Sequence, residues 1–287
     1  MRTLLIFCLL AIPFCLLAQD KNFASQTFKS TRIINTHSVE TIPKRKLDFR
    51  VTHRFGDIAG DFGGFQTLYG LENAADILIA FEYGITDDLM VGIGRTKGAG
   101  PIRQLIHGFV KYRALKQTEG PGFPISVTLV AGTTLSTMKK SETPDLLTSF
   151  EKFSHRQVHN GQVLVARKFS PWLSLQAQGI VVHRNLVDFD DTNTLVSAGV
   201  SARVQLNKVF AAIIDSNYTL DANRTPDNDF YFPLGVGLEI DTGGHVFQLN
   251  LTNTQGISEA DWVPYTQSNW LDGQYRLGFT ISRLFNL

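Results

Sequence analysis

The sequence predicts an all-β protein, a transmembrane up-and-down antiparallel β-barrel of about twelve strands. Three features lead to this fold class: apolar and polar residues alternate strictly, short and long connections alternate, and the last residues still carry a strand pattern. A period of two indicates strands with one apolar face. Membrane barrels combine brief turns at one end with longer loops at the other, whereas a soluble β-sandwich has no reason to sort its connections in this way.

The individual strands follow from twelve alternating runs. In the first run, Leu47, Phe49 and Val51 alternate with Asp48 and Arg50. The runs cover residues 47–55, 77–85, 89–94, 106–114, 125–135, 156–169, 173–184, 196–206, 210–218, 232–240, 247–251 and 275–287. Most have a length near the ~9–11 residues that a tilted spanning strand needs.

Two of these runs alternate less clearly than the others. In the fourth run, Leu105 and Phe109 place apolar side chains on the face that is otherwise polar. The run 156–169 is strand-like, but its phase is ambiguous. Both are still predicted as strands, because turn residues bound them and no stretch after the N-terminus approaches ~18 continuous apolar residues, the length of a spanning helix.

The connections support a barrel with two different ends. The short connections are rich in turn residues and lie at 86–88, 116–122, 170–172, 207–208 and 241–244. The longer ones lie at 56–75, 98–102, 138–155, 185–193, 220–230 and 254–273. An even number of strands places both termini on the periplasmic side, where the first strand pairs with the last and no sheet edge remains.

The N-terminal residues divide into two parts before the barrel begins. Arg2, followed by the apolar run 4–17 and a plausible cleavage site after Ala18, is typical of a secretory signal peptide over residues 1–18. The alternative is a membrane anchor, for which the run is short. Residues 19–44 are expected to be a polar periplasmic segment, and residues 45–287 the barrel.

Composition excludes several classes of function. Cys8 and Cys15 are the only cysteines and lie in the predicted signal peptide, so the mature chain has neither a disulfide nor a thiol nucleophile. Without Arg2, the 27 basic residues would become 26, equal to the 26 acidic ones. This balance gives no reason to expect nucleic acid as a partner. No cofactor, metal site or catalytic residue is predicted.

The charged residues of the strands are expected to face the lumen. They carry both signs, which leaves two interpretations open: a polar pore or ligand-binding lumen, and an ion-pair network that fills a narrow barrel. Twelve strands lie between small barrels filled by side chains and open porins. The predicted lumen residues are Asp48, Arg50, Arg54, Glu82, His107, Lys111, Arg113, Arg184, Arg203, Asp215, Glu239 and Arg276.

The terminal run resembles the C-terminal signal by which the outer-membrane assembly machinery recognises barrels. It departs from that pattern at Arg283, which interrupts the apolar phase, and at Leu287, where an aromatic residue is commoner. The resemblance implies two partners, outer-membrane lipid and the assembly machinery. The residues in phase are Tyr275, Leu277, Phe279, Ile281, Phe285 and Leu287.

The stretch SHRQVHNGQ resembles outer-membrane lipid hydrolases, which carry a serine, a histidine and a polar orienting residue on the barrel wall. It departs from their motif because His159 stands where a serine should precede Asn160. Ser154 is the nearest hydroxyl, and nothing in the sequence places it within reach. His155 and His159 lack a third ligand for a metal.

Aromatic residues mark two of the longer connections. Phe62, Phe65 and Tyr69 in the glycine-rich loop 56–75 indicate that part of it packs, as a constriction, a cap or a partner contact. A flexible external loop is the alternative. In the last loop, Trp262 and its neighbours Tyr265 and Trp270 are expected in the aromatic girdle at the membrane interface in preference to a sugar-binding platform.

The stretch RVTHRFGDIAGDFGGFQTLYGLENAADILIAFEYGITDDLMVGIGRTK at 50–97 resembles an outer-membrane β-barrel family, domain-of-unknown-function family 5777, over most of residues 40–287. The resemblance implies the fold and the bacterial outer membrane, but no reaction. The expected function is a non-enzymatic passive channel or small-solute binding barrel. A structural or adhesin-like barrel and a lipid hydrolase are the alternatives.

Overall fold

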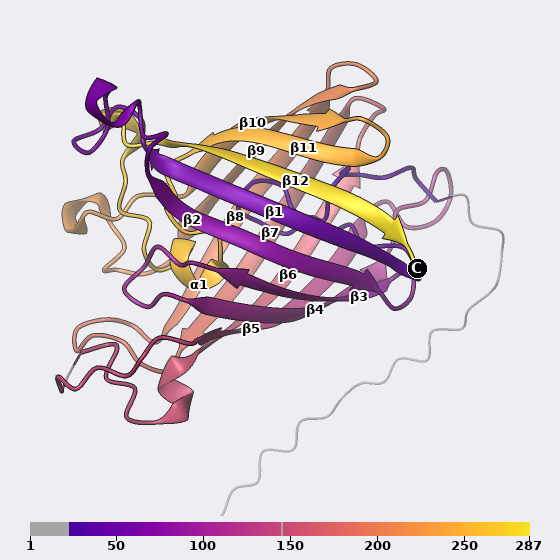
Figure 1. Cartoon of the computed structure of the whole chain (residues 1–287). Coiled ribbons are helices and arrows are strands. Elements are labelled where there is room, and N and C mark those ends of the chain that lie inside the picture. The colour runs from indigo at the N-terminus through magenta and orange to yellow at the C-terminus, as the bar shows by residue number, and fades with distance from the viewer. Residues whose placement is uncertain (1–22, 145) are drawn as a thin grey trace, which may run out of the picture.

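The computed structural model describes residues 23–144 and 146–287. Twelve strands form a closed barrel in which each strand pairs antiparallel with its sequence neighbours (Figure 1). This confirms the predicted fold class and strand number. The strands are β1 (Lys46–Asp57), β2 (Ala74–Gly84), β3 (Leu89–Thr96), β4 (Leu105–Leu115), β5 (Ser126–Ser136), β6 (Gln157–Lys168), β7 (Leu173–Arg184), β8 (Thr194–Gln205), β9 (Phe210–Thr219), β10 (Leu234–Asp241), β11 (His245–Thr252) and β12 (Arg276–Asn286).

The barrel closes between its first and last strands. Lys46 lies opposite Asn286, and the register continues to Arg54 opposite Gly278 before an irregularity near the end of β1. Each edge of the sheet therefore meets another edge, and the ladder of backbone hydrogen bonds is complete around the wall.

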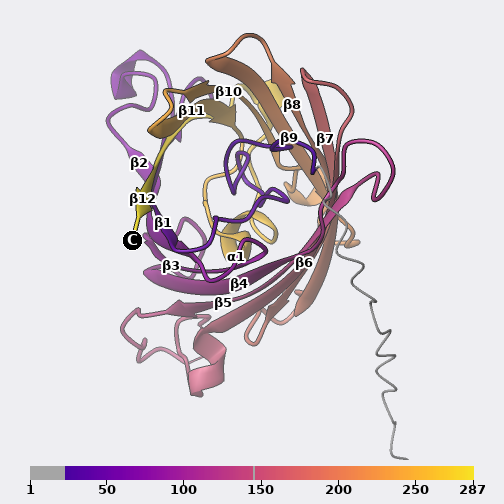
Figure 2. The ribbon, with the colours of Figure 1, turned by 90° about the vertical axis from the view of Figure 1, so that its right-hand side faces the viewer.

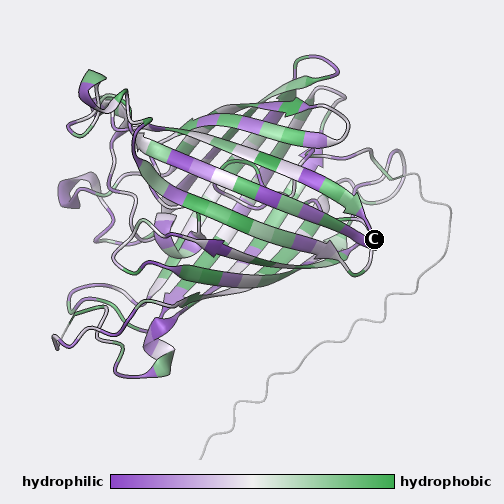
Figure 3. Ribbon diagram, in the orientation of Figure 1, coloured by the Kyte–Doolittle hydropathy of each residue, from purple (hydrophilic) through white to green (hydrophobic). Residues whose placement is uncertain are grey.

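Alternation along each strand separates the inner face of the wall from the outer face (Figure 3). On β7, Ser174, Gln176 and Gln178 are buried, whereas Leu175 and Val181 are exposed on the outside. Side chains of consecutive strand residues point to opposite faces, so an alternating sequence gives a polar lumen and an apolar outer surface.

The two ends of the barrel differ in their connections (Figure 1). The terminal end holds the C-terminus and the short turns, and the loop end holds the longer connections. No helix within residues 23–144 and 146–287 has the length and apolarity to cross a membrane. The short helices are η1 (Phe65–Thr67), η2 (Phe153–Arg156), η3 (Pro226–Asn228), α1 (Glu259–Trp262) and η4 (Trp270–Asp272).

The segment before β1 lies inside the barrel rather than in the periplasm beyond it (Figure 2). Residues 27–42, named here the N-terminal hairpin, are almost entirely buried. Two pairs of atoms define its turn: Ile33 N to Thr36 O and Ser38 N to Thr31 O, each 2.9 Å apart. The predicted signal peptide and residues 19–22 lie outside the described residues.

A second segment enters the lumen from the loop end. Residues 253–266, named here the inserted loop, connect β11 to β12 and carry α1 (Figure 2). Nearly all of them are buried. The core of this barrel is therefore the contact between its inner wall and these two segments.

Candidate functional site

The candidate site is the centre of the lumen, where the N-terminal hairpin meets the inserted loop. Apolar side chains hold one side of the hairpin against the wall. Ile33, Ile34 and Val39 belong to a buried cluster with Phe109 of β4 and Leu164 of β6. Full burial of one such side chain contributes about 1.5–3 kcal/mol. Phe109, which blurs the alternation of its strand, faces inward because it packs against the hairpin.

The tip of the hairpin is held by one carboxylate of β9. Asp215 Oδ2 accepts hydrogen bonds from the backbone N–H groups of Asn35 at 2.6 Å, Thr36 at 3.2 Å and Ile34 at 3.3 Å. Its Oδ1 accepts from Asn35 Nδ2 at 2.8 Å. Thr36 and Asp215 are both fully buried. The Thr36 hydroxyl also donates to Oδ2, at 3.4 Å. A buried carboxylate needs such donors, and the tip supplies five.

Space for the tip comes from a residue without a side chain. Gly235 of β10 faces the lumen beside Ile34, and a Cβ atom built at this glycine would lie 2.8 Å from Ile34 Cγ2. A larger residue there would overlap the hairpin. The position therefore requires glycine for a close approach between wall and hairpin.

The shaft of the hairpin joins an ion-pair network on β1 and β2. Arg50 Nη2 lies 3.0 Å from Asp48 Oδ2, and Arg50 Nε lies 3.8 Å from Glu82 Oε1. Thr31 Oγ1 donates to Glu82 Oε2 at 2.5 Å, and Arg32 Nε lies 4.0 Å from Glu82 Oε1. Paired charges offset part of the cost of their own burial. Charges of the wall are thus neutralised partly by the hairpin.

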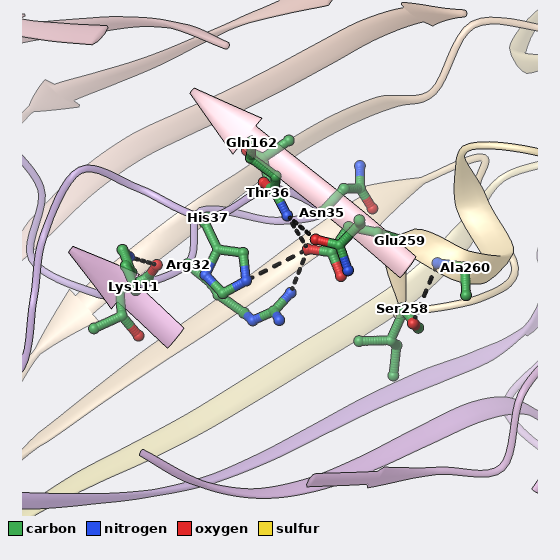
Figure 4. Close-up of polar contacts among 12 residues, drawn as sticks. Arg32, Asn35, Thr36, His37, Lys111, Gln162, Ser258, Glu259 and Ala260 are labelled. Carbon is green, nitrogen blue, oxygen red and sulfur yellow. Dashed lines mark hydrogen bonds and ion pairs between the residues drawn. The ribbon is translucent and has the colours of Figure 1, made fainter. Parts of the chain in front are cut away.

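The hairpin and the inserted loop meet at Glu259 (Figure 4). Its Oε1 accepts hydrogen bonds from Arg32 Nη1 and from Gln162 Nε2 of β6, each at 3.2 Å, and lies 3.5 Å from His37 Nε2. Burial, followed by the charges of Arg32 and Lys111, lowers the pKa of His37 well below its ordinary value. His37 is therefore neutral near pH 7, and Arg32 carries the positive charge of this contact.

Arg54 of β1 joins the same two segments at a second point. Its guanidinium donates to Asn35 Oδ1 and Thr254 Oγ1, each at 2.5 Å, and to the carbonyl of Gly256. Thr254 Oγ1 also donates to Asn35 Oδ1 at 2.8 Å. One wall arginine thus contacts the hairpin tip and the inserted loop together.

The inserted loop has its own apolar anchors. Trp262 and Val263 pack in a cluster with Ile180 of β7 and Leu195 of β8, and Ile257 packs in another cluster on β2. The α1 turn begins at Ser258, whose side chain accepts a hydrogen bond from the N–H of Ala260. The loop is therefore fixed to the wall on opposite sides of the lumen.

All twelve predicted lumen residues lie on the inner face, and the structure gathers most of them into separate groups. Arg203 Nε donates to Glu239 Oε1 at 2.7 Å. Arg113 Nη1 lies 3.5 Å from Glu40 Oε2 of the hairpin. His107 is buried without a hydrogen-bond partner among the described residues. The remaining groups place Asp48, Arg50 and Glu82 together, Arg54 and Asp215 around Asn35, Lys111 on Thr31 O, Arg184 on Asp191, and Arg276 on Asn253 O and Ser268.

The residues that the N-terminal hairpin and the inserted loop contribute to the centre of the lumen were not predicted as site residues. Arg32, Asn35 and His37 precede the first strand, and Glu259 lies in a loop, so strand periodicity does not select them. The hairpin does carry a usable signal, because Ile33, Ile34 and Val39 are apolar in a segment expected to be solvated.

The aromatic residues of the last loop do not form one girdle. Trp262 is buried in the lumen, because α1 turns it inward onto β7 and β8. Tyr265 accepts a hydrogen bond from Arg184 Nη1 at 3.0 Å. Trp270 stacks on Tyr275, with ring centroids 4.8 Å apart. The expectation of a girdle is therefore wrong for Trp262.

The terminal run forms β12 as predicted from its alternation. Leu277, Phe279 and Ile281 point outward, and Arg276, Thr280 and Ser282 are buried on the inner side. Phe285 also lies on the outer face, where the Arg283 guanidinium stands 5.0 Å from its ring centroid. Tyr275 and Leu287 flank the strand. A role of these residues in assembly stays a prediction.

The residues considered for a lipid hydrolase do not converge. His159 points outward and its Nδ1 lies 2.9 Å from Thr133 Oγ1. The neighbouring Asn160 points inward, where it accepts from Gln162 Nε2 at 3.1 Å. Ser154 lies in η2 and makes no hydrogen bond to either residue in the described chain. Adjacent strand residues face opposite sides, which separates the histidine from the amide.

Three solved structures resemble this barrel at low identity. They are a NanC porin (10% identity, 84% of this chain and 100% of that chain, TM-score 0.49), a KdgM porin (5%, 84% and 99%, 0.47) and the outer membrane protein Omp33 of Acinetobacter baumannii (8%, 85% and 99%, 0.41). At these values the likeness does not bear on function. The comparison with curated proteins gave no match.

The family comparison covers almost all of the described chain. A model of the membrane-bound β-barrel domain DUF5777 matches residues 28–285. The match begins within the N-terminal hairpin and ends in β12, so it includes both segments that fill the lumen. The chain therefore belongs to this family of membrane-bound β-barrels.

Proposed function

We propose that the protein is a channel of the bacterial outer membrane for small polar solutes, and that the N-terminal hairpin must withdraw for solutes to pass. The observation that carries the proposal is the polar contact between the hairpin tip and the wall. Thr36 and Asp215 are fully buried at mid-lumen, so the described conformation is closed there.

The chemistry of the inner wall supports a lumen that can hold water. Asp215, Arg54 and Glu82 bind the hairpin through hydrogen bonds that water can replace. A wall designed only to pack against a permanent core gains more from apolar residues, because replacing buried ion pairs by well-packed apolar groups is often stabilising. Withdrawal would also hydrate the apolar cluster on β4 and β6, which favours the closed conformation at rest.

The path of the hairpin supports withdrawal toward the terminal end. Phe23 forms a bridge with Thr118 in the connection between β4 and β5, and Pro43 leads into β1. Both arms therefore leave the lumen at the same end. The tip can move out without threading the chain through the barrel or breaking a strand pair.

The test is a reversible lock between the tip and the wall. Thr36 Oγ1 lies 3.4 Å from Ser201 Oγ of β8, so the pair T36C/S201C is placed to form a disulfide. The control pair is T52C/T280C, whose hydroxyl oxygens lie 3.0 Å apart across the β1–β12 seam. We expect planar-bilayer conductance of T36C/S201C to be lost on oxidation and restored by reduction, while the control pair conducts in both states.

Two results contradict the proposal. Conductance that persists in the oxidised T36C/S201C protein shows that solutes pass without movement of the tip. A parent protein that conducts in no condition, although it assembles with heat-modifiable gel mobility, indicates the alternative of a closed structural barrel.

A further inference from the structure

A cavity at the loop end carries an inference beyond solute passage. It has a volume of about 560 Å³ and lies over the ends of β9 and β10, between the connection 220–233 and the segment 263–271. This size falls in the range of roughly 300–1,000 Å³ that is typical of small-molecule sites. Its apolar lining is formed by Tyr218, Phe230, Phe232, Val263, Trp270 and Leu271.

Four polar residues of this cavity already bond to other parts of the protein. Thr219 Oγ1 donates to Val263 O at 3.1 Å, and Thr266 Oγ1 donates to Trp262 O at 2.7 Å. Arg224 binds both carboxylate oxygens of Asp191, at 2.7 and 2.9 Å. Asn253 Nδ2 donates to two backbone carbonyls. A ligand therefore meets mainly apolar surface, and such a cavity disfavours water.

The cavity is continuous with the membrane-facing surface. Tyr218 is the last outward residue of β9 and is 54% exposed, while Phe232 and Leu271 at the mouth are 50% and 93% exposed. At its inner side the cavity reaches Val263, which is 3% exposed in the apolar cluster of the inserted loop. It thus extends from the outer face of the wall to the back of α1.

We propose that this cavity binds one acyl chain of a membrane lipid, which enters from the bilayer beside β9 and β10. The outer face of a membrane-bound barrel is covered by lipid, so hydrocarbon is the surface that meets the mouth. The apolar lining matches hydrocarbon, and the paired polar groups offer no unmet partner for a headgroup. The bound chain contacts Val263 and therefore packs against the inserted loop.

Tryptophan fluorescence provides the test. The full-length protein is purified in detergent, delipidated, and titrated with phosphatidylcholine carrying bromine atoms on one acyl chain, which quenches tryptophan on contact. Trp172 is changed to Phe, because it is exposed at the terminal end and would report bulk lipid. The signal then comes from Trp270 in the cavity and from Trp262, which is buried in the lumen.

We expect quenching to saturate at one lipid per barrel and to depend on Trp270. Random mixing would instead make quenching follow the ratio of lipid to detergent. Leu271→Asp places a carboxylate at the mouth and should require about tenfold more lipid, because burying an unpaired charge against hydrocarbon is costly. Phe189→Asp is the matched control: Phe189 is a fully exposed residue outside the cavity lining, and its titration should equal that of the parent.

Other results would overturn the inference. Quenching that never saturates, or that is unchanged in Leu271→Asp, assigns the signal to bulk lipid. Quenching of equal size after Trp270→Phe places the lipid elsewhere. A dimer in sedimentation that dissociates in Leu271→Asp, without saturable quenching in the parent, assigns the surface to a second copy of the chain.

Discussion

The N-terminal hairpin and the inserted loop fill one lumen by different means. The hairpin packs apolar side chains on β4 and β6, and its tip is held by polar contacts with Asp215 and Arg54. The inserted loop is anchored by Trp262 and Ile257 on opposite walls, and behind Val263 it borders a cavity. The hairpin tip is thus closely packed at mid-lumen, whereas the inserted loop, although anchored on opposite walls, leaves a cavity beside Val263.

This difference assigns separate roles to the two segments. The hairpin tip occupies the centre of the lumen, so under the proposed channel function its position decides whether solutes can pass. The inserted loop covers the lumen nearer the loop end and supplies Glu259, a partner for the hairpin. Changes to the hairpin should therefore alter conduction most, and changes to the loop should act partly through the hairpin.

Deleting each segment in turn should give the largest difference in conductance between the hairpin and the inserted loop. Removing residues 26–42 empties mid-lumen, and we expect a large, sustained conductance in planar bilayers. Replacing residues 255–266 by a short Gly-Ser linker leaves the tip on Asp215, and conductance should stay low. Heat-modifiable gel mobility verifies that both barrels assemble. A conducting loop deletion with the hairpin still buried would make the loop the barrier.

Charge removal at the tip should have the next largest effect. Asp215→Ala leaves three backbone N–H groups of the hairpin without their acceptor, at a cost of about 1–3 kcal/mol for each buried group. Glu259→Ala should cost less, because Arg32 keeps Glu82 nearby. The measurement is the rate at which maleimide labels an I33C reporter, because Ile33 is buried in the described conformation. This rate should rise about tenfold for each 1.4 kcal/mol by which the buried position of the hairpin is destabilised. Faster labelling in Glu259→Ala than in Asp215→Ala would show that Glu259 holds the hairpin more strongly than Asp215 does.

A steric change tests the tip without removing a charge. Gly235→Val introduces atoms into the space of Ile34, and overpacking of this kind costs about 1–3 kcal/mol. We expect labelling of the same I33C reporter to rise by about tenfold. Gly179→Val is the matched control, because a Cβ at Gly179 meets no atom within 4 Å. Equal rates in the two variants would show that the tip does not need the space.

The smallest effect concerns pH and the inserted loop. Burial, followed by the charge of Asp76, raises the pKa of Asp261 to about 8. Between its ordinary pKa of 3.8 and this value, the folded state holds a proton that the unfolded state releases, so stability falls as pH rises and levels off above pH 8. Asp261→Asn should flatten this decline in the thermal unfolding midpoint. An unchanged pH profile would show that Asp261 is ionised in the folded protein.

Alternation was sufficient to predict the wall, because a strand with one face in lipid and one face on a polar lumen must repeat every two residues. It gave the inward positions of Arg50, Asp215 and Glu239. It did not give Arg32, which lies against Glu82, or Glu259, which binds Arg32, because both lie in segments whose placement depends on contacts far apart in sequence. Trp262 shows the same limit, because sequence alone does not distinguish a loop tryptophan at the membrane interface from one that α1 directs into the lumen.

The hairpin also constrains the order of assembly. Its tip forms contacts with a residue about 180 positions later, Asp215, and its shaft contacts Glu259, 227 positions after Arg32. Contacts of such long sequence separation form late, because the intervening chain must first be arranged. Until β9 and the inserted loop are in place, Ile33 and Ile34 have no complete site and remain open to solvent. The barrel therefore reaches its closed interior only when its last strands are in place, and burial of the N-terminal hairpin marks the completion of β12.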